Sequence, residues 1–121
     1  MAADGSSSFV VIFAVKVDEG KEEEVKELLP DFVSKVQKEE EALYYDFTLC
    51  GDELFCREAY LGAAGALAHL ENVGPELEKL LTLVEISRIE VHGPADELEK
   101  LKEPLAELNP SWWNFRCGLA R

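Results

Sequence analysis

Four polar residues fall on a surface that is otherwise predicted to be apolar. Glu58 and Tyr60 lie two apart in "LFCREAYL", Tyr45 lies in "ALYYDFTLC", and His69 lies in "AGALAHLEN". A carboxyl and an imidazole can transfer protons, and tyrosine hydroxyls can donate hydrogen bonds to an anion. The structural alternatives are a Glu58 that bonds Tyr45 or a helix end, and a half-buried His69 that bonds a backbone carbonyl.

A predicted hairpin brings these residues together. Two strand-like runs flank Gly51-Asp52, which is typical of a two-residue loop. Cys50 then opposes Glu53, and Asp46 opposes Arg57 as a charge pair that resists register slip. The helix-facing side of the hairpin is predicted to carry Leu43, Tyr45, Phe47, Leu49, Leu54, Cys56, Glu58 and Tyr60.

The remaining pattern predicts three helical regions and three more strands. A helix opens within residues 18–24 and keeps its apolar phase across Pro30, so Pro30 marks a kink or restart and not a new element. Small residues in the second helix allow close approach to a sheet. The other predicted elements are a strand at 9–17, a helix at 63–70 continued at 74–81 after Gly74-Pro75, a strand at 82–91, a helix N-capped by Gly93 with Pro94 at its first position that runs to Leu108, and a strand at 111–120.

This order, β-α-β-β-α-β with an appended α-β, predicts a ferredoxin-like α+β fold. A sheet with helices on one face exposes Tyr44, Phe55 and a tryptophan on the other, which predicts a homodimer that covers this face. Trp112 and Trp113 alternate, so one faces the helices and one faces the partner. Dimer packing is their principal predicted role, and stacking on a ligand is the alternative for one of them.

Composition limits the partners and the location. The chain has 121 residues and a net charge of −13, from 25 acids against 12 bases, which disfavours nucleic acid and anionic membranes. The acids at 18–24, 39–41 and 96–107 are interpreted as solvated helix faces. We expect a polar, mobile arm at 1–8, one domain at 9–121, no secretory signal and no membrane helix. Three cysteines without a C-x-x-C pair, all in strand-like runs, predict reduced structural thiols and a cytoplasmic protein.

Other sites find little support. The chain lacks the glycine-rich, nucleophile-elbow and zinc-protease motifs, and its two histidines, His69 and His92, form no metal constellation. His92 precedes the Gly93-Pro94 turn, and turn chemistry explains its local sequence better than catalysis does. We therefore expect no metal.

The segment "LFCREAYLGAAGALAHLENV" resembles the E-x-Y/W strand, small-residue helix and A-x-H pattern of antibiotic biosynthesis monooxygenase-like domains. The segment "EVHGPADELEKLKEPLAELNP" is similar to the carboxyl-terminal extension of one branch of that family. The resemblance covers roughly residues 9–119. It implies a dimeric α+β barrel, with a pocket in each subunit between the sheet and the helices.

The resemblance also implies chemistry. The haem-degrading branch of the family has an Asn on the first strand, a Trp on the second helix and an iron-binding His further along. At those positions this chain has Ile12, His69 and Lys79, so we expect no haem and no other cofactor. The expected activity is cofactor-independent monooxygenation of a phenolic or quinol-like molecule. The alternative is a non-catalytic dimeric module that binds a small aromatic or apolar ligand or only associates with itself. The expected catalytic residues are Glu58, His69 and Tyr60, and the expected substrate-binding residues are Tyr45, Phe47, Trp112 and Trp113.

Overall fold

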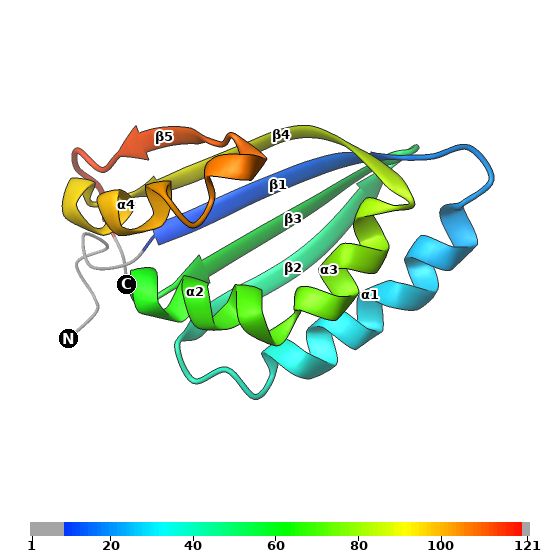
Figure 1. The fold of residues 1–121 in the computed structure, drawn as a ribbon, viewed down its shortest axis with the longest axis horizontal. Coiled ribbons are helices and arrows are strands. Elements are labelled where there is room, and N and C mark those ends of the chain that lie inside the picture. The colour runs from blue at the N-terminus through cyan, green and yellow to red at the C-terminus, as the bar shows by residue number, and fades with distance from the viewer. Residues whose placement is uncertain (1–8, 120–121) are drawn as a thin grey trace.

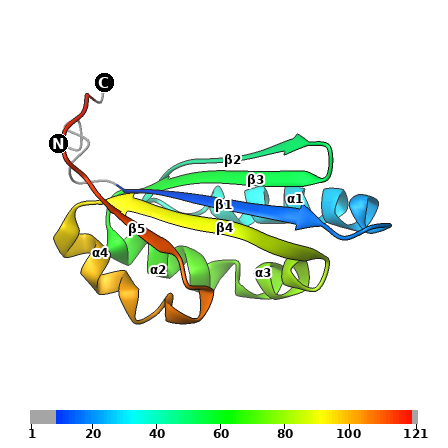
Figure 2. The same cartoon turned by 90° about the horizontal axis from the view of Figure 1, so that it is seen from above.

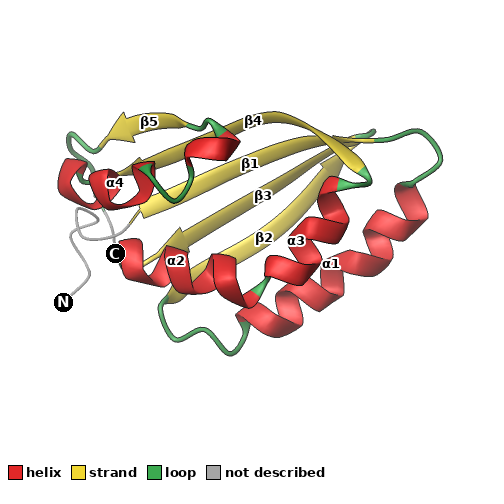
Figure 3. Ribbon diagram, in the orientation of Figure 1, coloured by secondary structure: helices red, strands yellow, loops and turns green. Residues whose placement is uncertain are grey.

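The computed structural model describes residues 9–119, so the arm predicted for residues 1–8 lies outside the described residues. The order of helices and strands along the chain is the one that the sequence predicts (Figure 3). In chain order the elements are β1 Phe9–Val17, α1 Glu22–Val36, β2 Ala42–Cys50, β3 Glu53–Tyr60, α2 Ala63–Asn72, α3 Gly74–Leu81, β4 Val84–Gly93, α4 Ala95–Lys102, the 3₁₀ turn η1 Ala106–Leu108, and β5 Ser111–Asn114.

The strands form one mixed sheet in the order β2-β3-β1-β4-β5 (Figure 1). The central strand β1 is antiparallel to both β3 and β4, whereas β5 joins β4 in parallel. The helices cover one face of this sheet, as the view from above shows (Figure 2). The predicted ferredoxin-like α+β fold with an appended α-β is confirmed. Within residues 9–119, no helix has the length and apolarity needed to cross a membrane.

The hairpin register is as predicted. Cys50 opposes Glu53, and Asp46 opposes Arg57 with their charged atoms 3.9 Å apart. The prediction that the whole inner side packs under helices is wrong at its ends, where Leu43 and Leu49 are 49% and 44% exposed. Leu43 falls at a register irregularity between Ala42 and Tyr44, and Leu49 is in the last pair but one before the turn.

The helices match the pattern with two corrections. Helix α1 continues through Pro30 as one element, as expected. The last helix does not run to Leu108 as predicted: α4 ends at Lys102, because Pro104 has no N–H to donate and disturbs the preceding turn. Its cap is also displaced by one residue: Gly93 is the last residue of β4, and Pro94 occupies the N-cap position.

The carboxyl-terminal strand is shorter than predicted. β5 ends at Asn114, so Cys117 lies outside any strand and is exposed, as Cys50 is within β2. Cys56 is the one described cysteine that is buried, in the role of a small apolar residue. The prediction that all three cysteines lie in strands is therefore wrong for Cys117, and all three are free thiols.

Two clusters of buried side chains form the core, one toward each end of the sheet. Strand β3 connects them: Leu54 belongs to the first, Tyr60 belongs to the second, and Cys56 and Glu58 lie between. The first cluster comprises Val15, Val17, Val25, Leu28, Phe32, Val36, Leu54, Val73, Leu80, Leu83 and Val84. The second comprises Tyr60, Ala63, Ala66, Val91, Leu98, Leu101 and Leu105.

Candidate functional site

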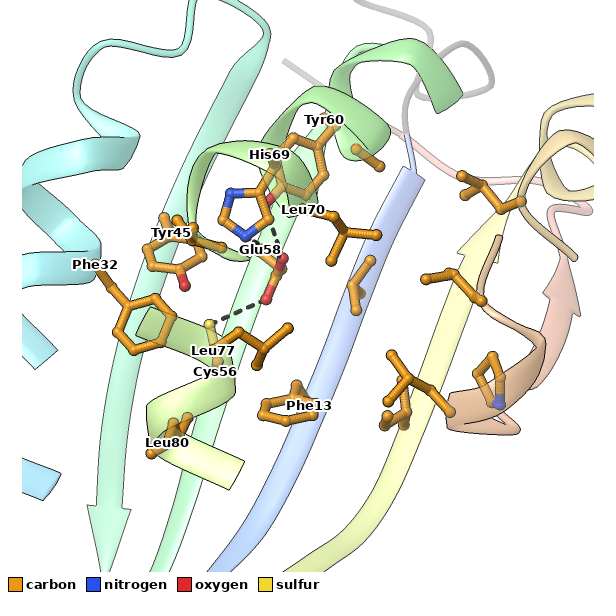
Figure 4. Close-up of a pocket in the computed structure, with 18 of the residues that line it drawn as sticks. Phe13, Phe32, Tyr45, Cys56, Glu58, Tyr60, His69, Leu70, Leu77 and Leu80 are labelled. Carbon is orange, nitrogen blue, oxygen red and sulfur yellow. Dashed lines mark hydrogen bonds and ion pairs between the residues drawn. The ribbon is translucent and has the colours of Figure 1, made fainter. Parts of the chain in front are cut away.

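A cavity of about 70 Å³ lies between the sheet and the helices, where the two core clusters meet. Side chains from both clusters line it, and Figure 4 shows them converging on a small polar centre. No lysine or arginine is among the described residues that line it. The polar side chains in the lining are Tyr45, Cys56, Glu58, Tyr60 and His69.

Glu58 is the centre of this polar group. Its carboxyl is nearly inaccessible, with 8% of the residue exposed. The Tyr60 hydroxyl donates a hydrogen bond to Oε1 at 2.7 Å, and the Cys56 thiol donates one to Oε2 at 3.2 Å. Burial raises the pKa of Glu58, and the facing His69 together with these two donors opposes part of that rise. The carboxyl is therefore suited to exchange a proton closer to neutral pH than an exposed glutamate is.

The neighbouring acidic groups remain protonated. Burial, followed by the charge of Glu58, raises the pKa of Tyr60 and of Cys56. Burial is also the principal cause that raises the pKa of Tyr45, with the nearby Cys56 and Glu58 adding to it. These three groups are therefore hydrogen-bond donors, and the bases of the site are the carboxyl and the imidazole.

His69 faces Glu58 from helix α2, with Nε2 3.4 Å from Oε1 (Figure 4). Its ring lies 5.1 Å from the ring centres of both Tyr45 and Tyr60. The opposite nitrogen, Nδ1, lies 3.1 and 3.0 Å from the two carboxyl oxygens of Glu39. The imidazole thus lies between two carboxyl groups, and only 5% of its side chain is exposed.

The sequence pattern does not identify Glu39. The interpretation of the acidic run at 39–41 as a solvated helix face is wrong for this residue: it lies in the loop between α1 and β2, and its side chain is only 10% exposed. Its neighbours Glu40 and Glu41 lie in the same loop, and both are exposed. Three consecutive glutamates carry no signal that separates the buried one, because loop geometry decides which of them turns inward.

Close packing positions the helix that carries His69. An added Cβ on Gly65 would lie 3.0 Å from the Cβ of Glu41 and 3.5 Å from that of Tyr60, so a larger side chain would push α2 off the sheet. The close approach expected from the small residues of this helix is confirmed. At its first turn the N–H of Ala63 donates to Oε1 of Glu97 at 2.7 Å, which fastens α2 to α4.

The structure brings five of the seven predicted site residues to the cavity. Glu58, His69, Tyr60, Tyr45 and Phe47 all line it.

The two tryptophans do not line the cavity. Trp112 packs against the second core cluster, and Trp113 is 51% exposed on the opposite face of the sheet. There the Trp113 ring stacks on His92, with ring centres 5.3 Å apart and an interplanar angle of 9°. Nε2 of His92 lies 2.9 Å from Oε1 of Glu90. Within residues 9–119, no group of three or more His, Cys, Asp or Glu side chains is arranged to hold a metal ion.

The chain matches no protein-family model and no curated protein. Solved structures do resemble it. MupZ from Pseudomonas fluorescens is 34% identical, with a TM-score of 0.91 over 96% of this chain and 91% of MupZ. The fold is also shared by two proteins each described as a "putative antibiotic biosynthesis monooxygenase". The one from Nitrosomonas europaea is 17% identical, with a TM-score of 0.65 over 74% of this chain and 92% of its own. The one from Chloroflexus aurantiacus J-10-fl is 15% identical, with a TM-score of 0.62 over 74% and 94%.

Proposed function

Because the chain belongs to the same family as MupZ and has the fold of antibiotic biosynthesis monooxygenase-like proteins, we propose that it oxygenates a small phenolic or quinol-like molecule without a cofactor. The observation that carries the proposal is the buried Glu58 carboxyl. It faces an imidazole at 3.4 Å inside a cavity that is otherwise largely apolar. A carboxyl and an imidazole buried together are costly to stability, and groups with perturbed pKa values are concentrated at functional sites.

The first step of the proposed reaction is removal of a substrate proton. Glu58, whose pKa is raised by burial, takes the proton, and His69 beside it stabilises the transfer. The Tyr45 hydroxyl, which remains protonated, can donate to the phenolate that forms. Deprotonation makes the substrate electron-rich enough to pass an electron to O₂.

The second step needs no external reductant. An activated ring carbon that carries two hydrogens forms a bond to one oxygen atom of O₂ and becomes a carbonyl. The other oxygen atom leaves as water together with the two hydrogens lost from that carbon. The ring carbon supplies all four electrons that reduce O₂ to the carbonyl oxygen and water, and the protein supplies a base, hydrogen-bond donors and a dry pocket.

The lining indicates a neutral substrate. Among the described lining residues there is no lysine or arginine to pair with a carboxylate or phosphate, and the chain as a whole is strongly acidic. The cavity of about 70 Å³ is smaller than the engineered cavities of about 150 Å³ that accept benzene. Lining side chains must therefore move to admit even a single aromatic ring.

The small cavity also favours the second candidate, a module that binds a small apolar ligand or only associates with itself and performs no chemistry. In that case Glu58 and His69 would serve only to satisfy each other inside the core.

Oxygen uptake in the presence of a chelator, measured with a panel of neutral quinols and hydroxylated anthrones, tests the proposal. We expect consumption by the wild-type protein and a loss of 100-fold or more in Glu58→Gln, which keeps the shape of the side chain but cannot take a proton. His92→Gln is the matched control and should retain activity. No consumption with any compound, together with ligand binding that Glu58→Gln leaves unchanged, would favour the module. Substrate conversion without oxygen uptake would retain the acid–base site and overturn the oxygenase.

The proposal includes a homodimer that covers the outer face of the sheet. This face presents Tyr44, which is 44% exposed, and Phe55, whose ring lies 5.4 Å beneath the guanidinium of Arg88. Phe55→Glu should convert a dimer into a monomer in light scattering, and Glu40→Gln, on the α1–β2 loop, should not. A wild-type protein that is monomeric at micromolar concentration would overturn the homodimer.

A further inference from the structure

We propose that Glu39 is a positioning residue, which holds His69 in the tautomer with its proton on Nδ1 and so turns the Nε2 lone pair toward Glu58. The catalytic meaning of this inference rests on the proposed function. The tautomer itself can be measured without any substrate.

The contact between the loop and the ring determines the direction of the hydrogen bond. Both oxygens of the Glu39 carboxyl lie within 3.1 Å of Nδ1. A carboxylate has no hydrogen to give, so Nδ1 must donate. A neutral imidazole has a single N–H, which leaves Nε2 as an acceptor. The other tautomer would place two acceptors 3.0 Å apart at Glu39. The Nδ1–H tautomer leaves only the longer contact of 3.4 Å between Nε2 and Glu58, whose carboxyl already accepts hydrogen bonds from Tyr60 and Cys56.

Glu39 is itself held in place. The side-chain amide of Asn72 donates to Oε2 of Glu39 at 2.8 Å and to the backbone carbonyl of Lys35 at 3.1 Å. The ammonium of Lys35 in turn donates to the backbone carbonyl of Asn72 at 3.2 Å. The end of α2 and the end of α1 are therefore joined around this carboxyl. The arrangement restricts its rotamers, as a residue that orients another one requires.

The consequence appears at the other side of the ring. Nε2 lies 3.4 Å from Oε1 of Glu58. With a lone pair on Nε2, His69 can accept the proton that Glu58 has taken from a substrate, and the Glu39 carboxylate then stabilises the imidazolium. The groups facing the ring are Glu39 from the loop, Glu58 from β3, and the rings of Tyr45 and Tyr60. A carboxylate that orients a histidine through Nδ1 plays the same part in serine-protease triads.

Nitrogen NMR of protein labelled at the histidine rings tests this directly. The chain has two histidines, and His92→Gln removes the signals of the other one. At a pH where the ring is neutral, we expect His69 to show a protonated Nδ1 and an unprotonated Nε2. An Nε2–H tautomer, or a ring that stays doubly protonated at every pH, would overturn the inference even if no Glu39 variant folds.

Variants at the loop extend the test. Glu39→Leu removes the acceptor, so the proton should move to Nε2, where Glu58 can accept it. Glu39→Asp should restore the Nδ1–H signal in part, and Glu40→Leu, one residue along the same loop, should leave it unchanged. An unaltered Nδ1–H tautomer in folded Glu39→Leu would reject the role.

Kinetics separate this inference from the proposed reaction. With a substrate identified, kcat should fall about 10- to 100-fold in Glu39→Leu, with KM changed less than about threefold. A protein that turns over no substrate but shows the expected tautomer would refute the reaction and leave the positioning role intact. A working enzyme with the opposite tautomer would do the reverse.

Discussion

The two histidines have similar nearest neighbours and opposite surroundings. Nδ1 of His69 lies 3.0 Å from a carboxyl oxygen of Glu39, and Nε2 of His92 lies 2.9 Å from one of Glu90. Each ring is also in contact with an aromatic ring, which for His92 is Trp113. The side chain of His69 is 5% exposed, however, and that of His92 is 41% exposed. A histidine, a carboxylate and an aromatic ring therefore do not make a reactive site by themselves.

The difference arises from the faces of the sheet. His92 is on the side that the helices leave bare, where water screens its attraction to Glu90 to about 0–1 kcal/mol. His69 reaches from α2 into the helix-covered side, where a second carboxyl, Glu58, lies on its other nitrogen. Removing water strengthens every electrostatic interaction there and makes an unpaired group expensive. Desolvation and the second carboxyl together distinguish the two sites.

The largest expected contrast is in catalysis. His69→Ala should lower kcat/KM by 100-fold or more, because it removes the group that accepts the proton from Glu58, whereas His92→Ala should change it less than about twofold. Both variants would be assayed with whichever quinol the oxygen-uptake screen identifies. Comparable losses in the two variants would show that the bare face takes part in the reaction and would end the contrast.

A second contrast is in coupling energy. Double-mutant cycles with alanine at Glu39 and His69 should give about 1.5–3 kcal/mol, the range of hydrogen bonds to charged groups. The same cycle at Glu90 and His92 should give about 0.2–1 kcal/mol. For each cycle, urea unfolding of the wild type, the two single variants and the double variant gives the coupling energy. A stronger coupling at the exposed pair would show that burial does not determine the strength of these contacts.

The third contrast is in the pH dependence of stability. Burial raises the pKa of Glu58, so the folded protein keeps this proton at a pH where the unfolded chain, with a carboxyl pKa of about 4.3, has lost it. Between these two pKa values the folded state binds more protons, and stability falls as the pH rises through that window. Glu58→Gln cannot ionise and should therefore gain stability relative to wild type from about pH 4 upward.

Glu90→Gln, beside the exposed histidine, is the matched control for this titration. Its effect on the free energy of unfolding should stay within about 0.5 kcal/mol at each pH, as for other exposed pairs. A difference between wild type and Glu58→Gln that is constant with pH, or that moves in the opposite direction, would show that the carboxyl is ionised as readily inside the fold as outside it.

Much of the candidate site around Glu58 could be predicted, because the features that place its residues are local in the sequence. The two-residue turn sets the hairpin register, and the register places Tyr45 and Glu58 on one face without any tertiary information. Small residues in α2 indicate a helix that lies close to that face, which brings His69 near. The family resemblance places a histidine at the same point.

What could not be predicted depends on loops and helix ends. Glu39 belongs to the site because the α1–β2 loop turns it inward, and three adjacent glutamates give no sign of this. Strand alternation predicts that the two tryptophans lie on opposite faces of the sheet. It does not predict that the cavity ends before it reaches either of them. Helix α4 is shorter than predicted because Pro104 interrupts it. Strand β5 ends at Asn114, and the sequence beyond it has no clear alternation of apolar and polar residues that would mark this end.

The smallest expected effect is that of Trp113 on the exposed pair. Trp113 stacks on His92 but is itself half exposed. Trp113→Ala should therefore cost about 0.5–1.5 kcal/mol of stability and change activity less than about twofold. Trp112→Ala, the adjacent residue on the opposite face, removes a ring packed against the second core cluster and should cost more. Urea unfolding of both variants at two protein concentrations measures this. If Trp113→Ala costs as much as Trp112→Ala, and costs more at low concentration, then a partner subunit covers the ring. His92 would then be buried in the dimer, and the contrast with His69 would reduce to the second carboxyl alone.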